Sequence, residues 1–249
     1  MLLKLLKYDF RAMWKHFSLI WGAALVLALV NRFILLRRFG EDFLINPDLF
    51  SLGIISVIMA MFVITIRFAI DRFSKGLLGS EGYLMHTLPV RSWELVLSKL
   101  ICGTVTWIVS GMVALVSPIL MTPMHYWREI IQITFRHYGN LFIILEFFLL
   151  LVSVIVQFIA AIYLSVSIGH LFVHRRRLIG VAAFIGLYIL LINFYDRVFS
   201  SDVMRWWMND VATSSVHSHF FTAIATMLIP AAVFLAGVCW ILNHKLNLE

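Results

Sequence analysis

Six long apolar stretches that contain no Asp, Glu, Lys or Arg occupy most of this 249-residue chain. They cover residues 16–31, 49–66, 100–127, 147–174, 178–195 and 211–244. A helix needs about 20 residues to cross roughly 30 Å of hydrocarbon. Lipid cannot form hydrogen bonds with backbone N–H and C=O groups, so a spanning segment must be a helix or part of a closed β-barrel. These stretches do not alternate between apolar and polar residues as barrel strands do, which leaves helices. The sequence therefore predicts an all-α polytopic membrane protein with six transmembrane helices.

The boundaries of the expected spans follow from the charged residues that flank each stretch. We expect spans at about 17–36, 49–70, 93–117, 140–168, 178–195 and 219–243, within a single membrane domain of residues 1–249. Charged residues make up 13% of the chain, against about 25% in soluble domains. Little chain remains for a water-soluble domain, so we expect any energy-supplying enzyme to be a separate polypeptide.

The distribution of basic residues predicts the orientation in the membrane, because Lys and Arg are enriched in cytoplasmic connections. Of the 20 Lys and Arg residues, four precede the first stretch, five lie in the 67–99 connection, three in the 169–177 connection and one in the tail. The other seven lie in the remaining connections. This asymmetry predicts that both termini are cytoplasmic. The net charge of +7 is explained by topology and adhesion to anionic lipid, and we expect no nucleic-acid partner.

Residues 1–16 are expected to form an amphipathic interfacial helix before the first span. Apolar side chains recur at three- and four-residue spacing on one face, and Lys4, Lys7, Arg11 and Lys15 follow the same spacing on the other. Such a helix lies in the headgroup plane of the bilayer, with its apolar side toward the acyl chains and its cations toward anionic lipid. Two interpretations remain open: a topology anchor, or a connecting helix that also contacts a cytoplasmic partner.

The connection between the second and third spans has the signals of a short helix. Ser80 is a suitable N-cap, Glu81 complements the positive end of the helix, and Pro89 ends it. Its apolar side chains are Tyr83, Leu84, Met85 and Leu88. Apolar side chains exposed on a cytoplasmic connection are typical of a docking surface. The alternative is a loop packed beneath the helical bundle.

Two local motifs and the six spans support a resemblance to a known family. The basic start Leu5-Leu6-Lys7-Tyr8-Asp9-Phe10-Arg11 and the stretch Glu81-Gly82-Tyr83-Leu84-Met85-His86-Thr87-Leu88-Pro89-Val90 resemble the permease subunits of type 2 ABC exporters. More narrowly, they resemble small bacterial permeases that are encoded separately from their ATPase. The phosphate-binding motif G-x-x-x-x-G-K-[ST] is absent, as expected if the ATPase is another chain.

The resemblance implies a dimeric permease, formed with a second copy or a paralogue, that binds two cytosolic ATPase subunits. Residues 1–16 would be the connecting helix and Glu81–Val90 the coupling helix, and 196–218 would hold a re-entrant element. The partner-binding residues would be Glu81, Tyr83, Leu84, Met85 and Leu88, joined by Arg175 and Arg176. ATP and Mg²⁺ would be bound by the ATPase, and this chain would hold no cofactor. The expected location is the bacterial cytoplasmic membrane, and the expected cargo is a hydrophobic or amphipathic compound such as an antimicrobial peptide.

Two polar side chains within the apolar stretches are candidates for a translocation path, because polar groups in a membrane are costly and often functional. Glu146 lies near the outer end of the fourth span, where it pairs with Arg136, lines a path, or reaches back to the interface. Gln157 lies near the middle of the same span and either contacts substrate or bonds to a neighbouring helix. We expect His217 and His219 to be ordinary interfacial histidines; the alternative is that an extended loop places both imidazoles on one side as metal ligands.

Two other classes of protein remain as alternatives to a permease. A six-span membrane enzyme needs a polar catalytic set at depth, and the sequence has no H-E-x-x-H, G-x-S-x-G or C-x-x-C motif, so we assign no catalytic or metal-binding residue. A substrate-binding membrane module without an ATPase partner accounts for six spans, but not for the basic amphipathic start.

Overall fold

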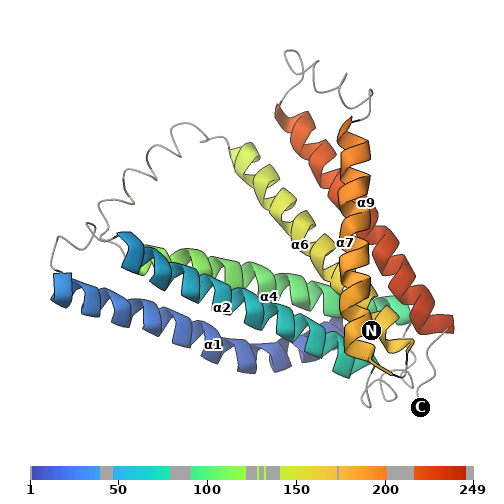
Figure 1. Ribbon diagram of the computed structural model, residues 1–249, viewed down its shortest axis with the longest axis horizontal. Coiled ribbons are helices and arrows are strands. Elements are labelled where there is room, and N and C mark those ends of the chain that lie inside the picture. Colours follow the sequence, from blue (N-terminus) through green and yellow to red (C-terminus); the bar gives the residue numbers. More distant parts are fainter. Residues whose placement is uncertain are drawn as a thin grey trace. The chain divides into compact units, whose positions relative to one another are not determined.

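The structure is a computed structural model that describes residues 2–39, 47–78, 91–121, 128, 132, 141–172, 174–200 and 216–244. Its long helices are α1 (Leu2–Phe39), α2 (Pro47–Phe73), α4 (Ser92–Met121), α6 (Leu141–His170), α7 (Arg176–Ser200) and α9 (Val216–His244) (Figure 1). A five-residue π-helix, η2 (Ser74–Leu78), directly continues α2. No strand occurs among the residues that the structure describes. The predicted all-helical class is therefore confirmed.

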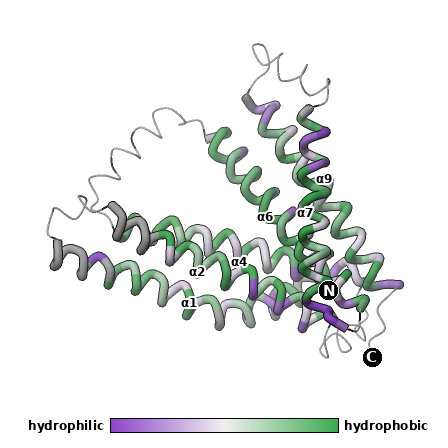
Figure 2. The backbone as a smooth tube through the Cα atoms, in the orientation of Figure 1, coloured by the Kyte–Doolittle hydropathy of each residue, from purple (hydrophilic) through white to green (hydrophobic). Residues whose placement is uncertain are grey.

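The composition of the helices indicates a multi-pass membrane protein. Five of them are long and apolar enough to cross a bilayer: Leu5–Val30, Ser92–Leu120, Phe142–His170, Arg176–Ser200 and His217–His244. The sixth long helix, α2, covers the second expected span. Hydrophobic residues run along the helices, and hydrophilic ones gather toward helix ends (Figure 2). Many large apolar side chains of these helices are exposed, as expected where the surrounding solvent is lipid.

The contacts divide the chain into two compact units. The first, which we name the α1 unit, contains α1 from Leu3, α2 up to Ala69, and α4 from Ile101. The second, the α6 unit, contains the end of α2, η2, the start of α4, and all of α6, α7 and α9. Each unit thus combines segments that are far apart in the sequence.

The α1 unit is held together by aromatic and sulfur-containing side chains. Its buried cluster consists of Met13, Phe17, Trp21 and Met61. The Phe17 ring meets Phe68 of α2 edge to face, with centroids 4.5 Å apart. Trp21 Nε1 donates to Ser110 Oγ of α4 over 3.1 Å, so the polar edge of a buried indole is satisfied within the unit.

Residues 2–16, which belong to the expected amphipathic helix before the first span, form the start of α1. α1 runs without interruption from Leu2 to Phe39, because no Gly or Pro near residue 16 stops it. The expected apolar face packs against protein: Met13 and Phe17 are buried in the α1 unit, whereas Trp14 of the same expected face is exposed.

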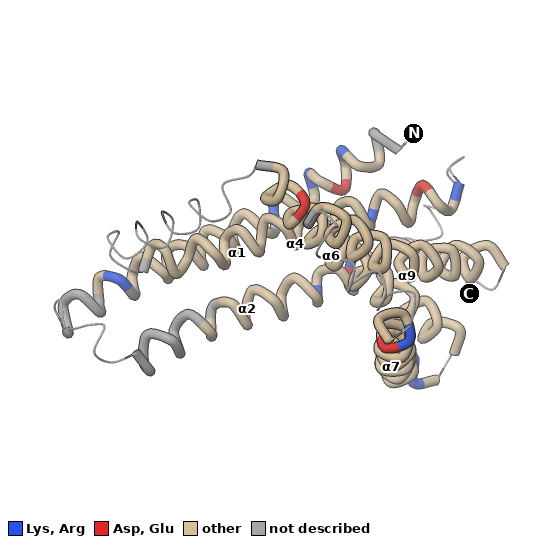
Figure 3. Tube along the Cα trace, turned by 90° about the horizontal axis from the view of Figure 1, so that it is seen from above, with Lys and Arg blue, Asp and Glu red and all other residues tan. Residues whose placement is uncertain are grey.

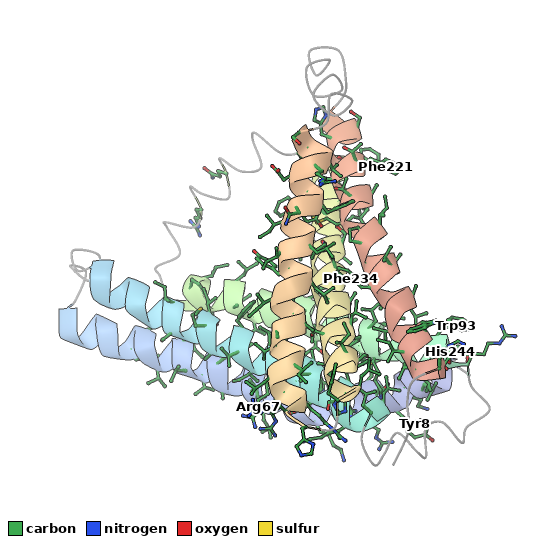
Figure 4. The ribbon with its side chains drawn as sticks, turned by 45° about the vertical axis from the view of Figure 1, so that its right-hand side comes forward. Tyr8, Arg67, Trp93, Phe221, Phe234 and His244 are labelled. Atoms are coloured by element: carbon green, nitrogen blue, oxygen red, sulfur yellow. The ribbon has the colours of Figure 1, made fainter. Side chains whose placement is uncertain are left out.

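The α6 unit is built around the contact of α6 with α7 and α9. Its buried cluster contains Ala160 and Ala161 of α6, Leu191 of α7, and Ala231 and Phe234 of α9. The alanines and Gly237, whose Cα hydrogen faces the Leu164 side chain, allow the helices to approach closely. Phe234 lies among these helices in Figure 4. Close packing of this kind favours association in lipid, where apolar burial alone supplies little driving force.

Candidate functional site

The middle of the α6 unit contains a chain of hydrogen bonds that joins three helices. Gln157 of α6 is buried, and its Nε2 donates to the Tyr195 hydroxyl of α7. That hydroxyl in turn donates to Met227 Sδ of α9 over 3.2 Å. The Tyr195 oxygen therefore accepts one bond and donates another. Gln157 was a candidate for the translocation path, and the structure places it in a contact between helices.

The end of the same unit where α6 and α9 begin contains a carboxylate–imidazole pair. Glu146 of α6 lies 2.7 Å, Oε1 to Nδ1, from His217 in the first turn of α9. The two side chains are 23% and 47% exposed, so the pair is partly accessible. The second carboxylate oxygen of Glu146 is buried, and no described residue donates a hydrogen bond to it. Arg136, which the sequence analysis considers as an ion-pair partner for Glu146, lies outside the described residues.

Glu146 and Gln157 lie on one face of α6. They are 11 residues apart, which places them about 16 Å apart along a helix. Ser153, seven residues after Glu146 and four before Gln157, is also buried, and its hydroxyl donates to the Leu150 carbonyl of its own helix. The amino-terminal part of this α6 face, which we name the polar seam, therefore carries Glu146, Ser153 and Gln157.

His217 and His219 lie in the first turn of α9, not in the extended loop that the metal-binding alternative requires. Side chains two residues apart on a helix point to different sides, so the two imidazoles do not form a chelating pair. Only Nδ1 of His217 meets Glu146. Among the described residues there is no group of three or more His, Cys, Asp or Glu side chains arranged to hold a metal ion.

The opposite end of the α6 unit contains a second set of contacts, around the π-helix η2. Phe73 stacks on Tyr163 of α6, with ring centroids 4.2 Å apart and planes 12° from parallel. The Tyr163 hydroxyl donates to the Lys99 carbonyl of α4 over 3.0 Å. Ser74 Oγ lies 3.1 Å from His170 Nε2. These contacts, which we name the η2 junction, fix the helix ends that flank residues 79–90.

A buried lysine belongs to the η2 junction. Lys99 is only 4% exposed, and its Cε and Nζ lie against the Cα of Gly76 in η2. A Cβ at Gly76 would lie 3.5 Å from the Lys99 Cε and 3.7 Å from its Nζ, so the lysine side chain packs at ordinary van der Waals distance from this position. Close by, Ser92 at the start of α4 donates to Asn243 near the end of α9, beside Trp93 and His244 in Figure 4. Sequence reasoning treated Lys99 only as a topology charge and did not find Tyr163.

The residues expected to contact an ATPase fall into two groups. Glu81, Tyr83, Leu84, Met85 and Leu88 lie outside the described residues. Arg175 and Arg176 are exposed in the tight connection between α6 and α7. Arg175 has a positive φ of 60°, which is uncommon for a residue with a side chain. The connection is tight because Gly169 lies close to the backbone of Gly180.

Charged residues are concentrated near helix ends in the described part of the chain (Figure 3). The class defined by these observations is a multi-pass helical membrane protein with a hydrogen-bonded three-helix bundle. A scan against protein-family models and searches of curated proteins and of solved structures found no match to this chain.

Proposed function

We propose that the chain is the membrane-spanning permease subunit of an ATP-driven exporter of the type 2 ABC class. In this proposal both termini are cytoplasmic, residues 79–90 contain the coupling helix, and a separate polypeptide hydrolyses ATP. Two permease chains form the pore, and the cargo is hydrophobic or amphipathic, with an antimicrobial peptide as the first candidate. The location is the bacterial cytoplasmic membrane.

The observation that carries the proposal is the η2 junction. A coupling segment transmits force only if its two ends are attached firmly to helices that cross the membrane. Phe73 and Ser74 at one end of the 79–90 segment contact Tyr163 and His170 of α6. At the other end, α4 is bonded to α6 through the Lys99 carbonyl. π-Helical turns such as η2 also occur frequently at functional sites.

The polar seam supports the same proposal from the other side of the membrane. It carries polar groups from the outer end of α6 to its middle, and three helices contribute to its hydrogen bonds. Polar groups at this depth are expensive, so their presence favours a role beyond passive anchoring. We infer that Glu146 and Gln157 border the outer half of the route that the cargo takes.

The test is whether the purified full-length protein captures the cytosolic ATPase that the proposal requires, which we would seek first in the gene beside that of this chain. Tyr83→Ala should weaken capture by about 2 kcal/mol, or roughly thirtyfold, because aromatic anchors dominate interface energies. Tyr188→Ala, the same change at an exposed position on α7, is the matched control and should bind normally. The measurement is a pull-down at low and at high salt.

Two outcomes would contradict different parts of the proposal. In the first, Tyr83→Ala captures the ATPase normally, high salt weakens capture by the wild type, and only the triple variant Arg175→Ala/Arg176→Ala/Arg177→Ala loses capture. The coupling contact is then electrostatic and lies at the α6–α7 connection. If the wild-type chain captures no ATPase at either salt concentration, the proposed function itself is wrong.

A further inference from the structure

The exposed side of the first third of α1 combines cations and aromatic rings. Lys7, Tyr8, Arg11, Trp14 and Lys15 are all exposed and recur at three- and four-residue spacing. Tyr8 is 74% and Trp14 62% exposed, although both are large rings. We name these five residues the basic–aromatic stripe. Figure 3 shows basic residues near the amino terminus, and Figure 4 labels Tyr8 there.

The opposite side of the same helix is already occupied by protein. Met13 and Phe17 belong to the buried cluster of the α1 unit, and the Thr106 hydroxyl of α4 donates to Met13 Sδ. Asp9, the only acidic residue of α1, is also buried. The three charged side chains of the stripe, Lys7, Arg11 and Lys15, are therefore all cations. On the expected apolar face, protein covers Met13 and Phe17, whereas Trp14 stays exposed.

The length of α1 sets the depth of the stripe in a bilayer. The segment between Lys15 and Arg32 has no charge and spans about 25 Å as a helix, close to the roughly 30 Å of the hydrocarbon layer. Each headgroup layer adds roughly 5–8 Å. The helix continues unbroken on the amino-terminal side of Lys15. Trp14 and Arg11 therefore fall within the headgroup layer. Lys7 lies about 12 Å beyond Lys15 along the helix, and its long side chain can extend back toward the interface.

We propose that the basic–aromatic stripe is a binding surface for the phosphate groups of anionic phospholipids in the leaflet that contains the start of α1. Lys and Arg attract anionic headgroups, and Tyr and Trp favour the interface because their rings are apolar with one polar edge. The helix therefore passes through the headgroup layer and binds lipid with its charged side, instead of lying in the plane on its apolar side.

A headgroup bound at the stripe acts directly on the fold. Trp14 and Trp21 meet edge to face with centroids 5.9 Å apart, and Trp21 belongs to the buried cluster. Anionic lipid should therefore stabilise the α1 unit. The assignment of this leaflet to the cytoplasm rests on the topology in the proposed function, whereas the lipid contact does not depend on an ATPase partner.

The test uses the purified full-length protein in mild detergent with added phosphatidylglycerol, phosphatidylcholine or inorganic phosphate. We expect phosphatidylglycerol alone to raise the unfolding temperature, measured by tryptophan fluorescence. The variant Arg11→Gln/Lys15→Gln should require about thirtyfold more phosphatidylglycerol for half of the wild-type effect, since each cation near an anionic surface contributes roughly fivefold. Arg37→Gln/Arg38→Gln removes two charges at the other end of α1 and should respond as wild type does.

A second measurement keeps the proposal testable if the Gln variant does not fold. Brominated phosphatidylglycerol should quench the tryptophan fluorescence of the wild type more than brominated phosphatidylcholine does, and Trp14→Phe should remove this difference. The proposal is overturned if the two lipids stabilise and quench equally, or if inorganic phosphate reproduces the stabilisation. It is also overturned if both double variants respond alike, or if Trp14→Phe leaves the quenching difference intact.

Discussion

At the scale of single residues, the bond between Gln157 and Tyr195 is the clearest case of a polar contact within the apolar helices. Tyr195→Phe removes the hydroxyl that accepts from Gln157 and donates to Met227. We expect a loss of about 1 kcal/mol in unfolding free energy, the usual size of such bonds in membranes. The loss should be measurable by denaturant-induced unfolding in detergent.

A double-mutant cycle distinguishes this bond from general packing. Gln157→Leu should lower the unfolding free energy by about as much as Tyr195→Phe does. The double variant should lower it little further than either single change, because the two residues share one interaction. Asn193→Leu is the control, since the Asn193 amide is exposed and, among the described residues, bonds only to the Ile189 carbonyl of its own helix. Strictly additive effects of the two changes would show that Gln157 and Tyr195 act separately.

Residues of this site could be predicted from the sequence where a polar side chain stands within an apolar stretch. Gln157 and Glu146 stand out as polar side chains in apolar stretches, so they were found. Their pairings were not predicted: Tyr195 was not singled out, and His217 was considered only as an interfacial or metal-binding residue. Both pairings arise from how α6, α7 and α9 pack. Lys99 was misjudged for a related reason: a basic residue beside a span is usually solvated, and only the fold shows that this one is buried against Gly76.

At the scale of helices, the connection between α6 and α7 depends on two glycines. A Cβ at Gly169 would lie 2.7 Å from the Arg176 carbonyl oxygen and 3.0 Å from Gly180 Cα. Both are backbone atoms that cannot move without displacing a helix. We therefore expect Gly169→Ala to reduce the unfolding free energy by about 1–3 kcal/mol, the usual cost of overpacking.

Gly186→Ala is the matched control for this change, because nothing lies within 4 Å of the position where its Cβ would be. It should be neutral or stabilise α7 by up to about 1 kcal/mol through higher helix propensity. Unfolding temperatures of the two variants in the same detergent provide the comparison. Equal temperatures for both variants would mean that α6 and α7 are not held together through Gly169.

The helices themselves were the most predictable part of the fold. Six uncharged stretches long enough to span a bilayer require helices, and each lies largely within one of the six long helices. The π-helix η2 at the end of α2 was not predicted from the sequence. The sequence predicts that residues 1–16 lead directly into the first span, and α1 runs through both. The pattern of Lys and apolar residues does not show whether lipid or protein contacts each face of this helix.

At the scale of the whole molecule, the number of long helices and the distribution of Lys and Arg determine the expected topology. An even number of crossings places both ends of the chain on one side, and the basic connections favour the cytoplasm for that side. The η2 junction, Arg175 and the basic–aromatic stripe would then all lie at or near the cytoplasmic surface. The Glu146–His217 pair would lie near the opposite one.

Labelling of single cysteines in intact cells tests this topology. With Cys102 and Cys239 replaced by Ala, we expect Ile45→Cys to react with a membrane-impermeant maleimide added outside, because residue 45 follows the first crossing. His86→Cys, in the connection after the second crossing, should react only after the cells are permeabilised. Labelling of both variants in permeabilised cells is the control for reactivity. Reaction at residue 86 in intact cells, with residue 45 protected, would show that the topology is the inverse of the one proposed. The coupling segment would then not be cytoplasmic, and the basic–aromatic stripe would lie in the outer leaflet.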